Sequence, residues 1–203
     1  MELDHLAVAG LTLAEAATQV ETALGVMLQQ GGEHDIFHTH NKLLGLDDGL
    51  YLEAISVNAV APAPERPRWF DLDNFSGSPR LTNWICRCND LDATLADLPE
   101  TFGAPVSLQR GDLRWRMAVP ASGRLPFDNC APALIEWQGD MHPAMMLETS
   151  QCALIDLQVS HPEVNALRDL LAPFLTDTRV GFVSGPRALR ARFTTPSGER
   201  MLT

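Results

Sequence analysis

Three titratable side chains lie within short apolar stretches, where a charge is costly unless it has a partner. His5 belongs to the stretch from Leu3 to Ala9, and Glu53 and Glu136 are each flanked by large apolar residues. A carboxylate removed from water is tolerated when it is paired, hydrogen-bonded or bound to a metal. Strand alternation leaves another interpretation open, because either glutamate could face solvent and His5 could be a hydrogen-bonded core residue. The three residues are therefore candidates for a pocket with acid–base or metal chemistry.

Three of the six histidines lie in one short stretch, residues 34–40. The first two have the H-x-x-x-H spacing of zinc metalloproteases, with an aspartate where those proteins have glutamate. That motif needs a helix to present both imidazoles on one face, whereas Gly31-Gly32 directly upstream favour a loop. We expect a loop that overhangs a cavity, with His40 or Asn41 contacting a substrate. A loop in solvent is the alternative.

Aromatic and basic side chains suggest further contacts to a ligand. Trp84, Trp115 and Trp137 could form an aromatic wall for a planar or apolar molecule, although ordinary core packing would use the same residues. Arg114 and Arg116 flank Trp115 at strand spacing, so they share one face. The pair could hold a carboxylate-bearing substrate or could be a solvated edge. We take Trp84, Arg114 and Trp137 as candidate substrate-binding residues.

Composition and charge narrow the class of protein. Fifteen basic against 26 acidic residues give a net charge of −11, which disfavours nucleic acid and anionic membrane surfaces as partners. No apolar run is long enough to cross a membrane, and the first residues are acidic, so we expect a soluble cytoplasmic protein. The four cysteines contain no C-x-x-C pair and indicate buried thiols, with a metal pair at Cys86 and Cys88 as the alternative. The expected partner is a small molecule or a second copy of the chain.

The order of strand and helix signals repeats along the chain. Thr12 and Glu15 have capping-box spacing, and Gly25 stands where a helix would end. Asp47-Asp48-Gly49 predict a hairpin turn, and the proline-containing segment 61–80 reads as a linker with a short helical turn near residues 68–74. The expected first-half elements are strand 3–9, helix 13–24, a polar loop, and strands 41–46 and 50–57.

The second half begins with a strand over 81–88 and a short helix capped by Asp90 or Asp92. Residues 4–11 resemble residues 83–91, and residues 51–55 resemble residues 134–137, so the chain predicts two copies of one unit. The later expected strands are 106–109, 113–119 and 133–137, then 153–159, a helix over 162–174, and strands 180–183, 188–194 and 199–202. The expected domains are a first β-α-β-β-β module (1–60), the linker (61–80), a second module (81–145) and a partial third copy (146–203).

Several short motifs, in this order and spacing, resemble those of the glyoxalase-like domain proteins. This group belongs to the vicinal oxygen chelate superfamily, with glyoxalase I, bleomycin-resistance proteins and extradiol dioxygenases. The similarity covers most of residues 3–145, and no single motif is specific. The matching segments are Leu3-Asp4-His5-Leu6, Gly31-Gly32-Glu33-His34, Thr39-His40-Asn41, Tyr51-Leu52-Glu53, Ile135-Glu136-Trp137 and His142-Pro143.

The resemblance implies an α+β fold in which tandem β-α-β-β-β modules form a curled, half-open mixed sheet around a divalent metal. Matched residue by residue, the metal ligands are His5, Glu53 and Glu136, and the fourth position falls at Trp84, which cannot bind a metal. One nitrogen and two oxygen ligands suit Zn²⁺, Mn²⁺, Ni²⁺ or Fe²⁺. Glu53 or Glu136 would be the catalytic base.

The resemblance predicts a metal-dependent enzyme, of the lyase or isomerase type or a dioxygenase, acting on a small vicinal-oxygen substrate. The alternative is a non-catalytic small-molecule binding protein of the bleomycin-resistance type, which the missing fourth ligand favours. A third possibility is an interaction module with a degenerate cavity. Homodimerisation is possible because modules of this superfamily pair within or between chains.

Overall fold

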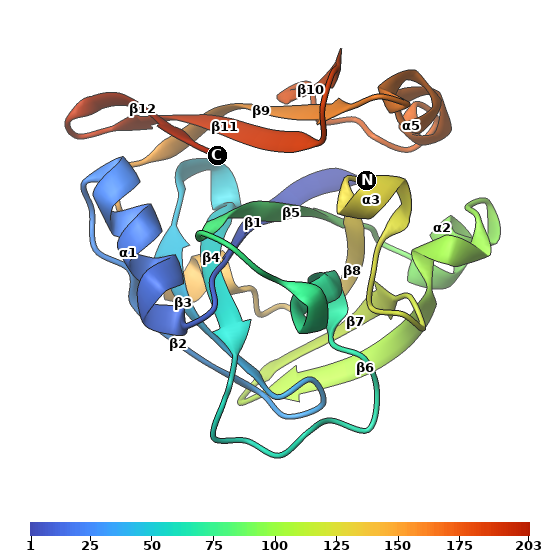
Figure 1. The fold of residues 1–203 in the computed structure, drawn as a ribbon, viewed down its shortest axis with the longest axis horizontal. Coiled ribbons are helices and arrows are strands. Elements are labelled where there is room, and N and C mark those ends of the chain that lie inside the picture. Colours follow the sequence, from blue (N-terminus) through green and yellow to red (C-terminus); the bar gives the residue numbers. More distant parts are fainter.

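The computed structural model describes residues 1–203 and contains two β-sheets (Figure 1). The larger has eight strands in the order β2-β3-β4-β1-β5-β8-β7-β6, curled into a half-barrel. The smaller has four strands in the order β10-β9-β11-β12 and lies across the top of the half-barrel in Figure 1. The predicted α+β fold of tandem modules is therefore confirmed.

Each half of the large sheet comes from one β-α-β-β-β module, in which a strand is followed along the chain by a helix and three more strands. In each half the first strand pairs with the last in parallel, and the two halves join through antiparallel β1 and β5. The first half contains β1 (Glu2–Ala9), α1 (Leu13–Leu24), β2 (Gln29–His34), β3 (Thr39–Gly45) and β4 (Tyr51–Val57). The second contains β5 (Arg80–Arg87), α2 (Leu91–Ala96), β6 (Ala104–Arg110), β7 (Leu113–Val119) and β8 (Ala133–Gln138).

Short helical turns occupy the connections between strands. They are η1 (Asp47–Gly49), η2 (Trp69–Asn74), η3 (Glu100–Phe102), α3 (Pro126–Asn129) and α4 (Pro143–Met146). The helix ends follow from the sequence: Thr12 and Glu15 form a capping box at α1, and Gly25 ends that helix with a φ of 73°. One local prediction was wrong, because the Gly31-Gly32 segment is part of strand β2 and not a loop.

The C-terminal segment repeats the order of elements but not the pairing of strands. It contains β9 (Ala153–His161), α5 (Val164–Leu171), β10 (Val180–Ser184), β11 (Ala188–Thr195) and β12 (Gly198–Leu202). Its first strand lies between the second and the third, parallel to β10 and antiparallel to β11. In the two modules the first strand instead pairs with the last, so this segment is not a structural copy of them.

Strand alternation separates two apolar cores. The outer, convex side of the half-barrel packs against α1 and the small sheet, and its 34 buried residues include Leu6, Trp84 and Phe193. The concave side holds 16 buried residues, including Ala7, Ile85 and Trp115. Both faces of the sheet are therefore covered by apolar residues, and the concave face is curled enough to enclose polar groups as well.

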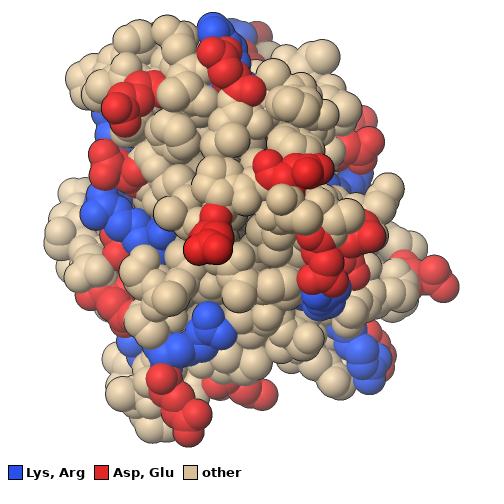
Figure 2. Space-filling model, turned by 90° about the vertical axis from the view of Figure 1, so that its right-hand side faces the viewer, with Lys and Arg blue, Asp and Glu red and all other residues tan.

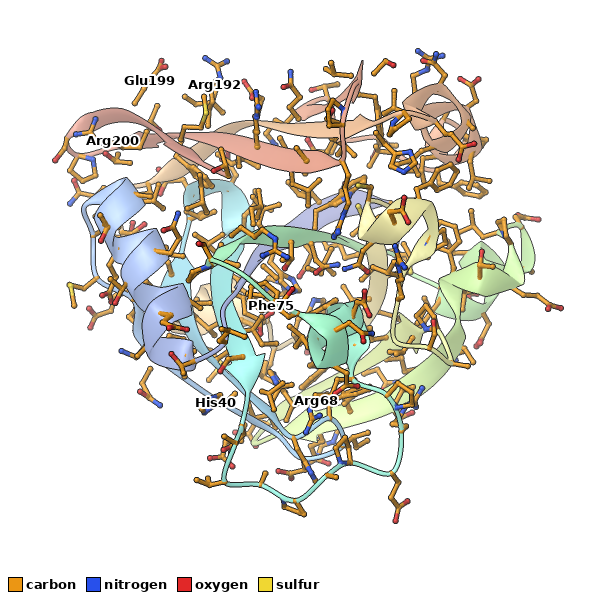
Figure 3. All side chains as sticks on the ribbon, in the orientation of Figure 1. His40, Arg68, Phe75, Arg192, Glu199 and Arg200 are labelled. Carbon is orange, nitrogen blue, oxygen red and sulfur yellow. The ribbon has the colours of Figure 1, made fainter.

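Most charged side chains lie on the outside of this assembly. Glu199 and Arg192 point away from the half-barrel on the outer face of the small sheet (Figure 3), and Arg192 pairs with Asp156. The face in Figure 2 shows acidic and basic side chains interspersed. No helix of the chain has the length and apolarity to span a membrane.

Candidate functional site

A small cavity of about 30 Å³ opens on the concave side of the half-barrel. Eight of its 14 lining residues are hydrophobic, so a few polar groups face one another in a largely apolar setting. The lining residues are His5, His34, Asn41, Leu43, Tyr51, Glu53, Trp69, Phe70, Arg110, Trp115, Met117, Ile135, Trp137 and Pro143.

Adjacent parallel strands place His5 and Glu53 in this cavity. His5 of β1 is opposite Tyr51 of β4, and Ala7 is opposite Glu53, so the period of two aims all these side chains at the concave face. The imidazole of His5 stacks on the Tyr51 ring, with 4.3 Å between centroids. His5 is 4% exposed and Glu53 5% exposed, so both are shielded from bulk water.

Asp4 fixes the orientation of His5 from behind. A register shift between Leu3 and His5 turns the wholly buried Asp4 carboxylate toward the imidazole. His5 Nδ1 lies 2.6 Å from Asp4 Oδ1, and because a carboxylate can only accept, the proton is on Nδ1. The other ring nitrogen, Nε2, then faces Glu53 Oε2 at 3.8 Å. The arrangement is a carboxylate–imidazole–carboxylate chain that ends in the cavity.

Asp4 is held in its charged form. Trp137 Nε1 donates to Asp4 Oδ2 at 3.0 Å, and His142 Nε2 lies 3.0 Å from the same oxygen. Burial alone would raise the pKa of Asp4, but the hydrogen bonds of His142 and His5 outweigh it and hold that pKa well below its usual range. His5 therefore has a permanent anionic partner.

A second set of polar residues lies on the other side of Glu53. Asn41 Nδ2 donates to Glu53 Oε1 at 2.5 Å, while Asn41 Oδ1 accepts from the backbone N–H of Gly32 and from Arg110 Nη1, at 2.8 and 3.2 Å. Arg110 Nη1 also lies 3.4 Å from His34 Nε2. No carboxylate lies within ion-pair distance of Arg110, which leaves a positive charge in the cavity wall.

His34 is neutral in this setting. Burial lowers its pKa to about 3, and the positive charge of Arg110 acts in the same direction. His34 Nδ1 lies 2.9 Å from Thr39 Oγ1, which leaves Nε2 as an acceptor toward Arg110 and Asn41. His34 therefore helps to orient the cation and the amide.

The two glycines of β2 make room for these groups. A Cβ on Gly31 would lie 2.1 Å from Asn41 Oδ1, and a Cβ on Gly32 would lie 2.7 Å from Arg110 Cδ. The strand is irregular here, with a register shift between Gln30 and Glu33. The bare backbone lets the Asn41 amide and the Arg110 side chain cross over β2.

The structure brings together four of the candidate site residues, His5, Asn41, Glu53 and Trp137. Trp115, from the predicted aromatic wall, lines the same cavity. The structure places Glu136 and Trp84 on the other face of the sheet. Glu136 Oε2 accepts from the backbone N–H of Leu91 at the start of α2, and Trp84 is buried in the outer core, where its Nε1 donates to Cys130 O. Matching the two modules one residue out of register inverts the face of every strand side chain, which explains both placements.

His40 and Arg114 also lie outside the cavity. His40 alternates with Asn41 on β3 and points the opposite way, with its Nε2 2.8 Å from Ser56 Oγ (Figure 3). Arg114 is exposed and borders a surface groove that shares only His34 and Trp115 with the cavity. Neither His40 nor Arg114 lines the cavity around Glu53.

Only two of the three predicted metal ligands share the cavity. His5 Nε2 and Glu53 converge, whereas Glu136 faces away and the Arg110 cation lies beside the remaining imidazole, His34. No group of three His, Cys, Asp or Glu side chains in the chain has the arrangement of a metal centre. The residues present therefore do not fit the three-ligand metal site that the resemblance implies.

Several cavity residues were not identified from the sequence. Asp4, Arg110, Trp69 and Phe70 reach the site through bulges, strand ends and a connecting turn, none of which has a periodic signal. The one usable signal was Gly31-Gly32, because a glycine pair inside a strand indicates close approach by other groups.

Comparisons with known proteins identify the class of this fold. The sequence model of a family described as "Glyoxalase-like domain" matches residues 3–175. A solved structure of a hypothetical protein from Staphylococcus aureus is similar with a TM-score of 0.63 and 16% identity, covering 91% of this chain and 86% of that one. Methylmalonyl-CoA epimerase from Mycobacterium tuberculosis is similar with a TM-score of 0.44 and 18% identity, covering 68% and 88%. No curated protein matches the sequence.

Proposed function

The chain belongs to the glyoxalase-like domain family, and on that premise we propose that it moves a proton on a small, oxygen-rich carboxylate bound in the concave cavity. One observation carries the proposal. The Asp4–His5 pair and Glu53 face each other across 3.8 Å in a cavity whose wall contains the unpaired Arg110. This combination can hold an anion and exchange a proton with it.

Each polar group has a separate task. Arg110 binds the substrate carboxylate, since a guanidinium matches a carboxylate with two parallel hydrogen bonds. Glu53 takes a proton from the carbon next to a carbonyl or carboxylate group, whose oxygen accepts the electron pair of the broken C–H bond. Asn41 holds one oxygen of Glu53 in place. His5 Nε2, positioned by Asp4 and free of a proton, faces Glu53, so it accepts the proton from Glu53 and returns it to the substrate carbon. The aromatic walls from Trp69, Trp115 and Trp137 exclude water.

The proposal contains no step through a divalent metal. The superfamily implies Zn²⁺, Mn²⁺, Ni²⁺ or Fe²⁺, but only His5 and Glu53 of the expected ligand set reach the cavity. A small-molecule binding protein without catalysis is a second candidate. The mostly apolar lining favours it, because ligand affinity there needs only one anchoring charge.

The test follows exchange of substrate hydrogen for deuterium by proton NMR in deuterated water. The probes are 2-oxo and 2-hydroxy carboxylates, with diketones and catechols as uncharged comparisons. Protein treated with chelator is compared with the same protein supplied with each metal. Exchange with carboxylates by metal-free protein, reduced about 100-fold or more in Glu53→Gln, supports the proposal.

Glu136→Gln is the matched control, because Glu136 lies on the other face of the sheet. Exchange that requires an added metal would overturn the metal-independent mechanism. Saturable binding of a probe without exchange would assign the chain to the binding-protein class. Equal loss of activity in Glu53→Gln and Glu136→Gln would contradict the site described here.

A further inference from the structure

A second cavity lies between the two sheets, and it shares no lining residue with the first. Its volume is about 360 Å³, and it is bordered by the start of β5, the start of β11 and the residue that follows α3. Three of its nine lining residues are arginines and none is acidic. The lining residues are Arg80, Leu81, Thr82, Cys130, Arg187, Ala188, Leu189, Arg190 and Thr203.

Arg80 is fixed in place from one side. Its Nη1 donates to the backbone oxygens of Ser76 and Ser78, at 2.8 and 3.0 Å, and its guanidinium lies over the Phe75 ring at 4.5 Å. These contacts use neutral partners and leave the positive charge without a counter-ion. A guanidinium held in this way loses little freedom when it binds an anion.

Arg187 faces the same space. Burial lowers the pKa of Arg80, and the positive charge of Arg187 lowers it further, so the two guanidiniums lie close enough to repel each other. Arg187 and Cys130 line the same cavity, and the positive charge of Arg187 opposes the rise that burial causes in the pKa of Cys130. Two like charges thus meet in one cavity.

The arginines of this cavity have no acidic partner. Seven of the chain's 14 arginines form ion pairs with carboxylates, and Arg80, Arg187 and Arg190 are among those that form none. The chain has 26 acidic residues and a net charge of −11, so a supply of negative side chains is not limiting. The cavity keeps its positive charge unneutralised in an acidic protein.

We propose that the cavity between β5 and β11 binds a phosphate-class oxyanion, either inorganic phosphate or the phosphoryl group of a small metabolite, between Arg80 and Arg187. Guanidinium groups bind phosphate oxygens in pairs of parallel hydrogen bonds, and a dianion would remove the repulsion between the two arginines. Because Arg80 belongs to the half-barrel and Arg187 precedes a strand of the small sheet, the bound anion would join the two sheets.

The proposal predicts that phosphate stabilises the folded protein in a saturable way. Thermal unfolding is measured with inorganic phosphate, pyrophosphate and malonate, at constant ionic strength set with chloride. We expect phosphate or pyrophosphate at about ten times its dissociation constant to raise the melting temperature by about 3 °C. Titration calorimetry gives the dissociation constant, and pyrophosphate separates a free phosphate site from one built for a larger phosphorylated molecule.

Arg187→Ala should weaken phosphate binding about tenfold or more, and Arg80→Lys should weaken it while keeping a positive charge. Arg187 is exposed, so the variant should fold normally. Arg200→Ala is the control, because Arg200 lies at the outer edge of the small sheet (Figure 3). A phosphate effect that is unsaturable, equal in Arg187→Ala, or matched by malonate would overturn the proposal.

Discussion

Two buried side chains of the concave cavity have charge states set by their neighbours. Asp4 stays ionised because imidazole and indole groups surround its carboxylate, and His34 stays neutral because it is buried beside Arg110. An aspartate and a histidine that are exposed to water have the ordinary pKa values of their residue types. Acid should therefore act on this site through the unfolded state, in which both groups regain their usual pKa values.

The first prediction concerns His34 and the pH dependence of stability. Between pH 6.5 and about 3 the unfolded chain binds a proton on His34 that the folded chain does not. Stability should therefore fall as pH is lowered through that window, by up to roughly 1.4 kcal/mol per pH unit from this group. His34→Gln should flatten the dependence, as measured by urea unfolding from neutral pH to about pH 4.

Asp4 acts in a lower range, because its depressed pKa contributes stability that is lost only below the pKa of an ordinary aspartate. The His34 effect can thus be separated from it above about pH 4.5. Parallel pH profiles for the wild type and His34→Gln would contradict a depressed pKa at His34.

At the scale of strands, successive side chains point to opposite faces of the sheet, and this alternation decides which of the predicted residues lie in the cavity. Leu3–Ala9 and Tyr51–Val57 are readable as apolar strands that each contain one titratable residue matched by the family resemblance, so His5 and Glu53 could be identified together. The second module offered no independent marker of register, and a shift of one residue sent Trp84 and Glu136 to the outer face. Pairing between strands is a long-range property, which a single sequence does not encode locally.

The polar strand β2 escaped prediction for a different reason. Its sequence, Gln29–His34, has few β-forming residues, and its glycines normally indicate a loop. Tertiary contacts decide its conformation, because it pairs with β3 and lies near β6. The feature that hid the strand is also the one that admits Arg110 to the cavity.

The second prediction concerns this glycine pair. In Gly32→Ala the new Cβ would lie 2.7 Å from Arg110 Cδ, so the guanidinium must move. We expect about a tenfold loss of affinity for a carboxylate ligand, with the melting temperature changed by only about 2 °C. Calorimetric titration and thermal unfolding measure the two effects separately.

Two other glycines provide the comparison. Gly181→Ala has ordinary contact distances and should bind like the wild type, whereas Gly31→Ala meets the backbone of Asn41 at 2.4 Å and should destabilise the sheet. Unchanged affinity in Gly32→Ala would mean that the crossing over β2 does not position Arg110.

At the scale of the whole molecule, the small sheet completes the outer core. Buried residues from both sheets, among them Leu3, Trp84, Leu157 and Phe193, form one cluster. The segment is tied to the modules by backbone as well, since Leu81 donates to Thr203 O and Thr176 donates to Met1 O. The family match also continues to residue 175, beyond the second module.

The third prediction follows from this shared core. A chain ending at residue 150 would expose the outer face of β1 and β5, and we expect it to lose cooperative unfolding and to bind a hydrophobic dye. Circular dichroism with urea and dye fluorescence give the measurement, with the full chain as control. A truncated chain with a sharp unfolding transition would show that the two modules form an independent unit.

The distribution of tryptophans gives the molecule a built-in optical reporter. Trp69, Trp115 and Trp137 line the concave cavity, and the fourth, Trp84, is sealed between the sheets. A ligand entering the cavity changes the surroundings of three emitters and leaves the fourth in the same environment. Intrinsic fluorescence of the unlabelled protein can therefore follow occupancy directly, and Trp84→Phe would remove the constant background without touching the cavity.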